Sequence, residues 1–462
     1  MKFTVGEIVR ATGGTATMSS SEVVTGIATD SRKLKLGDAY VAIIGEHHDG
    51  HDFAEGAVCD GAALCIVSKP VDVPHILVED TVLALGAIAK LHRESLNAKV
   101  IGITGSSGKT STKDMLAQVL ANFGETIAPP GSFNNEIGLP STILRASKDT
   151  DYLVLEMGMR GLGHISYLCD IALPSVGAIL NVGSAHAELL GGRENIALAK
   201  SEIVQQLPED GTAVLYADDS LVLNSSQSTK ACILTFGEGS FADVQISHLT
   251  LNEKAQPRFD VTYKDETQQV ELKLVGEHQA LNASAVIAVC LAVGLKFEEI
   301  CNALNSISNI SKWRMEVTEL AGGITVVNDA YNANPESMRA GLKALKAMSE
   351  GRRTWAVLGE MRELGDDAAA AHDEIGRLIV RLDVNRLIAV GPGAKLIQMG
   401  ASQEGSWGDE AAHVDTLEDA LEILRNEVSP GDVVFFKASR AIGLERVAQA
   451  MIEHFTRENT HP

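Results

Sequence analysis

Short apolar runs alternate with amphipathic stretches along most of this chain. Runs of four to six β-branched and other apolar residues are typical of buried strands, and an apolar period of 3.6 residues is typical of helices. After Val100 the runs predict strands at Leu153–Glu156, Ala178–Val182, Ala213–Tyr216, Thr325–Asp329, Trp355–Leu358, Leu387–Val390 and Val433–Lys437. Strands that alternate with helices in this way predict an α/β fold with mostly parallel sheets.

Two segments depart from this alternation. Residues Asp243–Val275 have an apolar period of two, which predicts an antiparallel ribbon inside or beside the second of three predicted domains. A helix over Thr81–Ala98 links the first part of the chain to the next, and a second helix is expected at Gln279–Gly294. A chain of 462 residues is too long for one core, and the breaks fit three α/β domains, at 1–83, 84–312 and 313–462.

Composition narrows the class of protein. With 45% hydrophobic and 22% charged residues the chain is typical of soluble globular proteins, and no apolar run is long enough to span a bilayer. The formal net charge of −22 argues against nucleic acid or an anionic membrane as a partner. The six cysteines lack metal-ligand spacing, so we expect buried free thiols in a cytoplasmic protein, with a monomer as the default.

One stretch of the sequence gives the most specific indication of a binding function. The strand Val100–Thr104 enters a turn of small residues, and Lys109-Thr110 open an amphipathic helix. This order predicts a P-loop, in which backbone amides cradle phosphate, Lys109 adds a charge and Thr110 offers a hydroxyl to Mg²⁺. An ordinary strand–turn–helix junction is the alternative. The predicted ATP-binding residues are Gly105, Ser106, Ser107, Gly108, Lys109, Thr110 and Ser111.

The spacing of this loop departs from the common P-loop. Ile103 stands where the common motif has its first glycine, so the turn is shortened to Thr104–Thr110. The shortened form resembles the ATP-binding loop of the Mur ligases and folylpolyglutamate synthetases, which join a carboxylate to an amine. The loop alone indicates ATP and leaves the chemistry open.

Two further side chains follow predicted strands. Glu156 ends one strand, and His186 comes directly after another. Parallel strands place their carboxyl ends at one edge of the sheet, so both side chains are candidates to hold Mg²⁺ beside the nucleotide phosphates. A solvated glutamate and a structural histidine are the alternatives.

The role predicted for Lys200 depends on the residues around it in the sequence. Taken alone it is a surface lysine on a helix. The pattern Asn181-x-Gly-x-Ala-His186, followed by Glu194-Asn195-Ile196 and Ala199-Lys200-x-Glu202, resembles the central domain of the Mur ligases. In that family the matching lysine is carbamylated, because a neutral amine can react with CO₂ to give an anionic ligand for Mg²⁺. The resemblance implies this role for Lys200.

The same family supplies further matches. His278–Ala283 resembles a helix start whose asparagine, here Asn282, lies near adenine; local capping is the alternative. Arg314 matches an arginine that reaches ATP from the third domain, although Trp313 replaces the usual glycine before it. Asp329, at a strand end, could bind a ribose hydroxyl.

Three segments resemble the branch of the family that adds D-alanyl-D-alanine. They are Asn134-Asn135-x-x-Gly-x-Pro, Asp329-Ala-Tyr331-Asn332-Ala-Asn334-Pro and Leu358-Gly-Glu-Met-x-Glu-Leu-Gly365 with His372 downstream. Turn formation and helix capping are the alternatives for the asparagines. In the first domain Ser31 and Arg32 match residues of a UDP-binding domain, and in the last Lys437–Arg440 matches a Lys-Gly-Ser-Arg segment near the dipeptide or the UDP-tripeptide.

The resemblance spans about residues 20–450 and implies the three-domain Mur ligase architecture, with a central P-loop domain and a Rossmann-like C-terminal domain. It implies that ATP and Mg²⁺ serve to couple UDP-N-acetylmuramoyl-tripeptide to D-alanyl-D-alanine through an acyl phosphate, in cytoplasmic peptidoglycan precursor synthesis. We expect the third domain to close onto the second before chemistry. The alternatives are a sister ligase that adds one amino acid, a folylpolyglutamate synthetase, and a non-catalytic nucleotide-binding protein.

Overall fold

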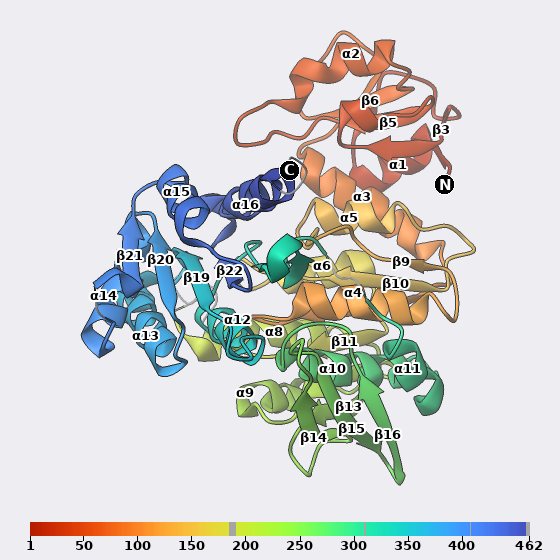
Figure 1. Cartoon of the computed structure of the whole chain (residues 1–462). Helices are drawn as coiled ribbons and strands as arrows, with labels where there is room; N and C mark the ends of the chain where they lie inside the picture. Colours follow the sequence, from red (N-terminus) through yellow and green to blue (C-terminus); the bar gives the residue numbers. More distant parts are fainter. Residues whose placement is uncertain (184–190, 309–310, 407, 459–462) are drawn as a thin grey trace.

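The computed structural model describes residues 1–183, 191–308, 311–406 and 408–458 (Figure 1). Its first sheet has the order β2-β7-β6-β5-β4, in which β2 alone is antiparallel to its neighbour. The strands are β2 (Thr15–Ala16), β4 (Gly26–Ala28), β5 (Asp38–Val41), β6 (Leu64–Val67) and β7 (His75–Leu77). A separate pair joins β1 (Phe3–Thr4) to β3 (Val23–Val24), and the helices are α1 (Val5–Thr12) and α2 (Ala54–Cys59).

The second sheet has nine strands in the order β16-β15-β14-β13-β12-β11-β8-β10-β9. Its strands are β8 (Lys99–Thr104), β9 (Thr126–Ile127), β10 (Tyr152–Glu156), β11 (Val176–Ile179), β12 (Thr212–Tyr216), β13 (Cys232–Gly237), β14 (Val244–Leu251), β15 (Pro257–Tyr263) and β16 (Glu266–Glu271). The pairs from β9 to β14 are parallel, and β14, β15 and β16 are antiparallel. The antiparallel ribbon predicted over Asp243–Val275 therefore continues this sheet.

Side chains that alternate along β8 explain why this sheet is covered on both faces. Val100 packs in one core with helices α3 (Thr81–Glu94), α6 (His164–Ala172) and α8 (Arg193–Gln205). Ile101 and Ile103 pack in another with α4 (Lys109–Leu120), α10 (His278–Ala292) and α11 (Phe297–Leu304). The first of these cores also includes α1 and strands of the first sheet, so α3 joins the first two sheets.

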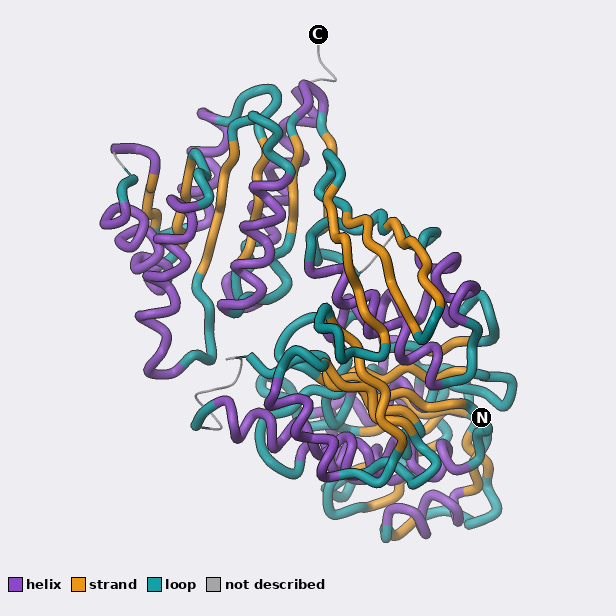
Figure 2. The backbone as a smooth tube through the Cα atoms, turned by 90° about the horizontal axis from the view of Figure 1, so that it is seen from below, coloured by secondary structure: helices purple, strands orange, loops and turns teal. Residues whose placement is uncertain are grey.

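The third sheet has the order β17-β18-β22-β19-β20-β21, and only its edge strand β17 is antiparallel. Its strands are β17 (Glu316–Glu319), β18 (Thr325–Asn328), β19 (Thr354–Gly359), β20 (Arg386–Val390), β21 (Ala411–Val414) and β22 (Val433–Lys437). Helices α12 (Pro335–Ala347), α13 (Ala368–Arg381) and α14 (Lys395–Glu404) cover one face, and α15 (Leu417–Glu427) and α16 (Glu445–Glu458) cover the other. Figure 2 shows the strands in separate groups with helices beside them.

The fold confirms the predicted α/β class and every strand predicted after Val100, with bounds shifted by at most three residues. The strand expected at Ala178–Val182 lies at Val176–Ile179, and the helix expected to reach Ala98 ends at Glu94. Among the strands after Val100, β9, β13, β17 and β21 were not predicted. Four cysteines are buried, but Cys59 and Cys232 are exposed, so the expectation of six buried thiols is wrong for these two. No described helix is long and apolar enough to cross a membrane.

Candidate active site

The glycine-rich turn between β8 and α4 depends on one glycine. Gly108 is the N-terminal cap of α4 and has φ +80°, a left-handed conformation that side chains disfavour. A Cβ at this position would lie 2.6 Å from Oδ1 of Asn282, so no larger residue fits. The predicted neighbour Asn282 is therefore packed against the loop itself.

Asn181, which the sequence reasoning assigned no role, holds the shape of this loop. Its Oδ1 accepts hydrogen bonds from the backbone N–H groups of Ser106 and Ser107, both at 2.9 Å. Its Nδ2 donates to the Ser107 carbonyl at 3.1 Å. The signal was present in the sequence, because a polar residue closely follows a buried strand that neighbours β8.

The amine of Lys109 lies at the mouth of the loop. Its Nζ donates to the Gly105 carbonyl at 2.6 Å. Surrounding atoms shield it from water and lower the pKa of the amine, while the nearby carboxylate of Glu156 opposes this shift. Lys109 and Glu156 therefore belong to one electrostatic cluster.

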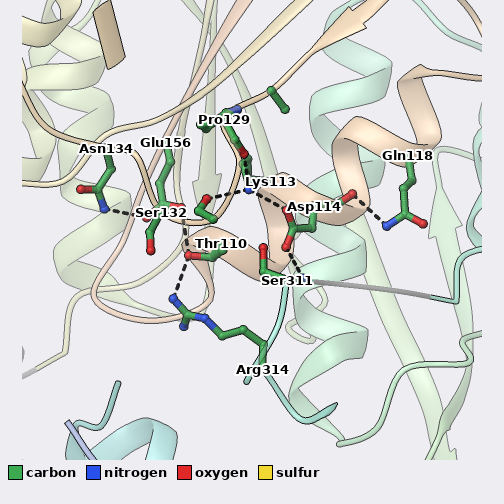
Figure 3. A network of polar contacts seen from close by, with 12 residues as sticks. Thr110, Lys113, Asp114, Gln118, Pro129, Ser132, Asn134, Glu156, Ser311 and Arg314 are labelled. Carbon is green, nitrogen blue, oxygen red and sulfur yellow. Dashed lines mark hydrogen bonds and ion pairs between the residues drawn. The ribbon is translucent and has the colours of Figure 1, made fainter. Parts of the chain in front are cut away.

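Glu156 organises the polar contacts beside the loop (Figure 3). This carboxylate, 1% exposed at the end of β10, accepts from Thr110 Oγ1 at 2.9 Å and from Asn134 Nδ2 at 2.7 Å. A guanidinium nitrogen of Arg314 donates to Thr110 Oγ1 at 3.0 Å. Four residues that are far apart in the sequence thus meet at the predicted magnesium and nucleotide site.

The backbone around Arg314 is strained. Trp313 and Met315 both have positive φ, +60° and +50°, which is rare for residues with large side chains. The Arg314 guanidinium lies over the Tyr331 ring, 4.3 Å from its centroid, and the Tyr331 hydroxyl accepts a short hydrogen bond from Ser132. The hydrogen bond from Arg314 to Thr110 and its stacking on Tyr331 hold this strained segment against the P-loop.

The predicted asparagines have two kinds of contact. Asn334 caps α12 by accepting from the Ser337 N–H at 2.8 Å, and its Nδ2 also donates to the Ser106 carbonyl at 3.4 Å. Asn135 Oδ1 accepts the N–H groups of residues 137 and 138, so its side chain stabilises a local turn, as the turn alternative predicts. Both residues, together with Asn332, nevertheless line the cavity described next.

A cavity of about 400 Å³ lies where the P-loop faces the third sheet. Its lining includes residues predicted from the sequence on both sides: Ser106, Ser107, Gly108, Lys109, Thr110, Asn134, Asn135, Glu156, Arg314, Tyr331, Asn332 and Asn334. The structure therefore gathers most of the predicted site. Ser31 and Arg32 lie elsewhere, on the short helix η1 (Ser31–Lys33), where the Arg32 side chain is 87% exposed and pairs with Asp30 at 2.8 Å.

Lys200 is not a surface residue. It lies on α8 and is 1% exposed, which rules out the surface interpretation. Burial lowers the pKa of its amine far below the ordinary value, and the charge of Lys109 lowers it further. This shift favours the neutral form of the amine. His186 lies outside the described residues, and among those described no three His, Cys, Asp or Glu side chains gather as a metal site.

A second buried lysine, Lys113, was not predicted. Its Nζ lies 2.8 Å from the carbonyls of Pro129 and Gly131 and 2.6 Å from Oδ1 of Asp114. The other carboxylate oxygen of Asp114 accepts the N–H of Ser311 at 2.7 Å (Figure 3). This network ties helix α4 to the segment that leads into the third sheet.

Asp329 makes its contacts with residues close to the third sheet. Its Oδ2 is 2.5 Å from Lys437 Nζ, and its Oδ1 accepts the N–H of Met315 at 3.1 Å. Lys437 also donates to the Asn332 carbonyl at 2.9 Å, and burial lowers the pKa of its amine despite the neighbouring carboxylate. Asp329 thereby fixes both the strained segment and the loop that carries Asn332.

Comparison with known proteins agrees with this architecture. Residues 23–123, 103–290 and 313–440 match the models described as "Mur ligase family, catalytic domain", "Mur ligase middle domain" and "Mur ligase, glutamate ligase domain". A Mycobacterium tuberculosis protein named UDP-N-acetylmuramoyl-tripeptide–D-alanyl-D-alanine ligase is 44% identical over 100% of both chains. Its Bacillus subtilis namesake is 35% identical over 98% of this chain and 99% of its own.

Solved structures give the same answer. The crystal structure of MurF from Acinetobacter baumannii has a TM-score of 0.88 and 32% identity, over 98% of this chain and 99% of that one. MurF from Thermotoga maritima, solved in complex with ADP, has a TM-score of 0.82 and 32% identity, over 94% of this chain and 99% of that one.

Proposed function

Because this chain belongs to the Mur ligase family, we propose that it couples the terminal carboxylate of UDP-N-acetylmuramoyl-tripeptide to the amine of D-alanyl-D-alanine, with ATP as the energy source. The product is a UDP-linked pentapeptide, a precursor of peptidoglycan. Both curated relatives carry the name of this activity over nearly the full chain. A sister ligase that adds one amino acid and a non-catalytic nucleotide-binding protein are not favoured.

One observation carries the proposal. A single cavity is lined by the P-loop and by the asparagine and tyrosine segments that the sequence associates with dipeptide addition, Asn134-Asn135 and Tyr331–Asn334. A nucleotide phosphate and a peptide carboxylate can therefore meet in one cavity. That geometry suits phosphoryl transfer to a carboxylate, which depends on positioning and charge stabilisation.

The residues present fit ATP and Mg²⁺. Lys109 and Arg314 line the cavity, and Nε of Arg314 is buried without a hydrogen-bond partner among the described residues. We assign the phosphates to the loop, adenine to the side of Asn282 and magnesium to Thr110, Glu156 and the carbamate of Lys200, with His186. When bound, Mg²⁺ neutralises phosphate charge and orients the oxygens that react.

The chain's own residues then act in two steps. Lys109 and Arg314 stabilise the charge that develops as the terminal phosphoryl group passes to the tripeptide carboxylate, giving an acyl phosphate and ADP. The dipeptide amine attacks the carbonyl carbon, and inorganic phosphate leaves with the electron pair of the broken C–O bond. The third domain, which carries Arg314, contributes to the first step by closing on the P-loop. We place the reaction in the cytoplasm.

One assay tests the function. ADP release is measured with ATP, Mg²⁺ and UDP-N-acetylmuramoyl-tripeptide, whose third residue is either diaminopimelate or lysine. Parallel reactions contain D-alanyl-D-alanine, single amino acids or no amine. We expect turnover that depends on the dipeptide, and Lys109→Ala should abolish it. Turnover with a single amino acid but not with the dipeptide would contradict the proposal.

A further inference from the structure

A second cavity, of about 350 Å³, adjoins the first on the side of the third sheet. The two cavities share Ser106 and Lys109 of the P-loop, the segment Tyr331–Asn334, and Glu363. Ligands in the two cavities would therefore meet at these shared residues. The second cavity extends from there to Arg362 and Arg440, which do not line the first.

The charges of the second cavity match a zwitterion. Glu363 is the one carboxylate among the described residues that line it, and Arg362 and Arg440 are the cations at its far side. Free D-alanyl-D-alanine has an ammonium group at one end and a carboxylate at the other. Since Glu363 borders both cavities, the matching orientation puts the ammonium end beside the P-loop cavity, where the acyl phosphate forms.

Arg440 is better fixed for the opposite end than Arg362. Its guanidinium lies 4.3 Å from the centroid of the Trp313 ring and 2.6 Å from a carboxylate oxygen of Glu445. The Arg362 side chain contacts Glu360 at the longer distance of 3.4 Å. Stacking on an aromatic ring leaves the edge of a guanidinium available for a carboxylate, and a fixed side chain loses less entropy on binding.

The backbone presents Glu363 in a braced loop after β19. The Met361 N–H donates to His372 Nε2 at 2.9 Å, and the Arg362 N–H donates to Ser439 Oγ at 2.9 Å. Glu363 itself has φ +64°, a left-handed conformation that costs a residue with a Cβ on the order of 1 kcal/mol. Strain of this kind persists only where the surroundings hold it, and it is common at functional sites.

Glu363 also lines the cavity of the P-loop, where the acyl phosphate forms in the proposed reaction. Its charge raises the pKa of Lys109, so its field reaches the P-loop. The other carboxylate lining the first cavity, Glu156, accepts hydrogen bonds from Thr110 and Asn134 with its two oxygens. Glu156 is thus committed to the magnesium side of the site.

We propose that Glu363 binds the ammonium group of the dipeptide and accepts one of its protons as attack begins. The inference rests on the proposed function. The ammonium nitrogen loses a proton to the Glu363 carboxylate, and its electron pair forms the C–N bond. The C–O bond to phosphate breaks, and phosphate leaves with the electron pair of that bond and takes up the second proton that the nitrogen loses as the amide forms. Glu363 then returns the proton to water.

The test separates acyl phosphate formation from amine attack. Hydroxylamine, a small nucleophile that is neutral at pH 7, traps the acyl phosphate as a hydroxamate without needing the ammonium site. In Glu363→Gln we expect hydroxamate to form within about threefold of the wild-type rate. Pentapeptide should form about 100-fold more slowly, which is the size of a lost general base. Glu298→Gln, at an exposed position on α11 and outside both cavities, is the control and should leave both rates unchanged.

A second variant guards against a purely structural effect. Glu363→Asp keeps the charge one methylene further back, so it should raise KM for the dipeptide yet ligate faster than Glu363→Gln. Dipeptide ligation at the wild-type rate in Glu363→Gln, or an equal loss of hydroxamate and pentapeptide, would overturn the inference. If the wild-type chain forms no pentapeptide from these substrates, the proposed function fails instead.

Discussion

Three lysines near the P-loop differ in what surrounds their amines. Lys113 has three oxygen atoms within 2.8 Å, including a carboxylate oxygen, and is a structural cation. Lys109 lies at the loop mouth, where phosphate charge would arrive. Lys200 is buried with a strongly lowered pKa, which favours the neutral, nucleophilic form of its amine. The same residue type thus supplies a structural brace and, in the proposed mechanism, a phosphate ligand and a site for carbamylation.

Lys200 should carry one CO₂ at neutral pH. Its neutral amine can attack CO₂ and release a proton, which leaves a carbamate with two oxygen atoms for Mg²⁺. With ¹³C-labelled bicarbonate, a carbamate resonance should appear in the wild-type protein and be absent from Lys200→Ala. That variant should lose at least about 100-fold in ligation, the scale of a lost metal ligand or its support. A fully active Lys200→Ala, together with no labelled resonance, would refute the assignment.

Replacing Lys113 should destabilise the fold. Lys113→Met fills similar volume but leaves the Asp114 carboxylate and two carbonyls without their cation. We expect a loss of about 3–5 kcal/mol in the free energy of unfolding, as for a broken buried ion pair. Urea unfolding measures it. Lys148→Met, at an exposed position, is the control and should stay within about 0.5 kcal/mol of wild type.

His278 predicts how stability changes with acid. Burial lowers the pKa of His278 to about 4, and its Nδ1 has no hydrogen-bond partner among the described residues. An unfolded histidine titrates near 6.5, so between pH 6.5 and 4 the unfolded chain binds a proton that the folded chain does not. Stability therefore falls as pH falls through this range. At pH 5 the titration of His278 lowers the free energy of unfolding by about 2 kcal/mol.

The variant His278→Gln lacks this titration. The difference in its unfolding free energy between pH 7 and pH 5 should be smaller than that of wild type by about 2 kcal/mol. Exposed His47→Gln is the control, and it should keep the wild-type slope. Equal slopes for His278→Gln and wild type would show that His278 titrates normally in the folded protein.

At the scale of elements, the local sequence pattern predicted the strands and turns that depend on residues adjacent in the chain. Apolar periodicity located the strands because each one is buried along its length, and the shortened turn located the P-loop. The pattern missed β17, an edge strand whose residues are largely exposed and therefore lack an apolar run. It also missed Lys113 and the stack of Arg440 on Trp313, since nothing local distinguishes a buried lysine or joins residues 127 positions apart (440 minus 313).

Two helix caps allow a matched test of the P-loop turn. Gly108 and Gly163 both cap helices with nearly the same φ, +80° and +83°. A Cβ at Gly108 would meet Asn282, but at Gly163 it would meet nothing within 4 Å. Both alanine variants should lose roughly 1 kcal/mol through backbone strain. Only Gly108→Ala should also raise KM for ATP, by about tenfold or more for a disturbance above 1.4 kcal/mol. Equal ATP affinities in the two variants would contradict the cradle.

At the scale of the whole molecule, the site exists only where two units meet. Hydrogen bonds from Arg314 to Thr110, from Asn334 to Ser106 and from Ser132 to Tyr331 join the third sheet to the P-loop side. These contacts are few and polar, and interfaces of this kind permit relative motion of domains. The net charge of −22 adds to the tendency of the units to separate when no cation is bound.

We therefore expect substrates to draw the units together. ATP with a non-transferable phosphate, Mg²⁺ and UDP-N-acetylmuramoyl-tripeptide bridge the two sides, because each side supplies groups to the same cavity. Small-angle scattering should show a smaller radius of gyration with all three ligands than without them, approaching the value calculated from the structure. Lys109→Ala, which lacks the phosphate ligand, should compact less at equal ligand concentrations. If the ligands bind to the wild-type chain and its radius of gyration does not fall, the site is already assembled before substrates arrive, and closure is not a step of the reaction.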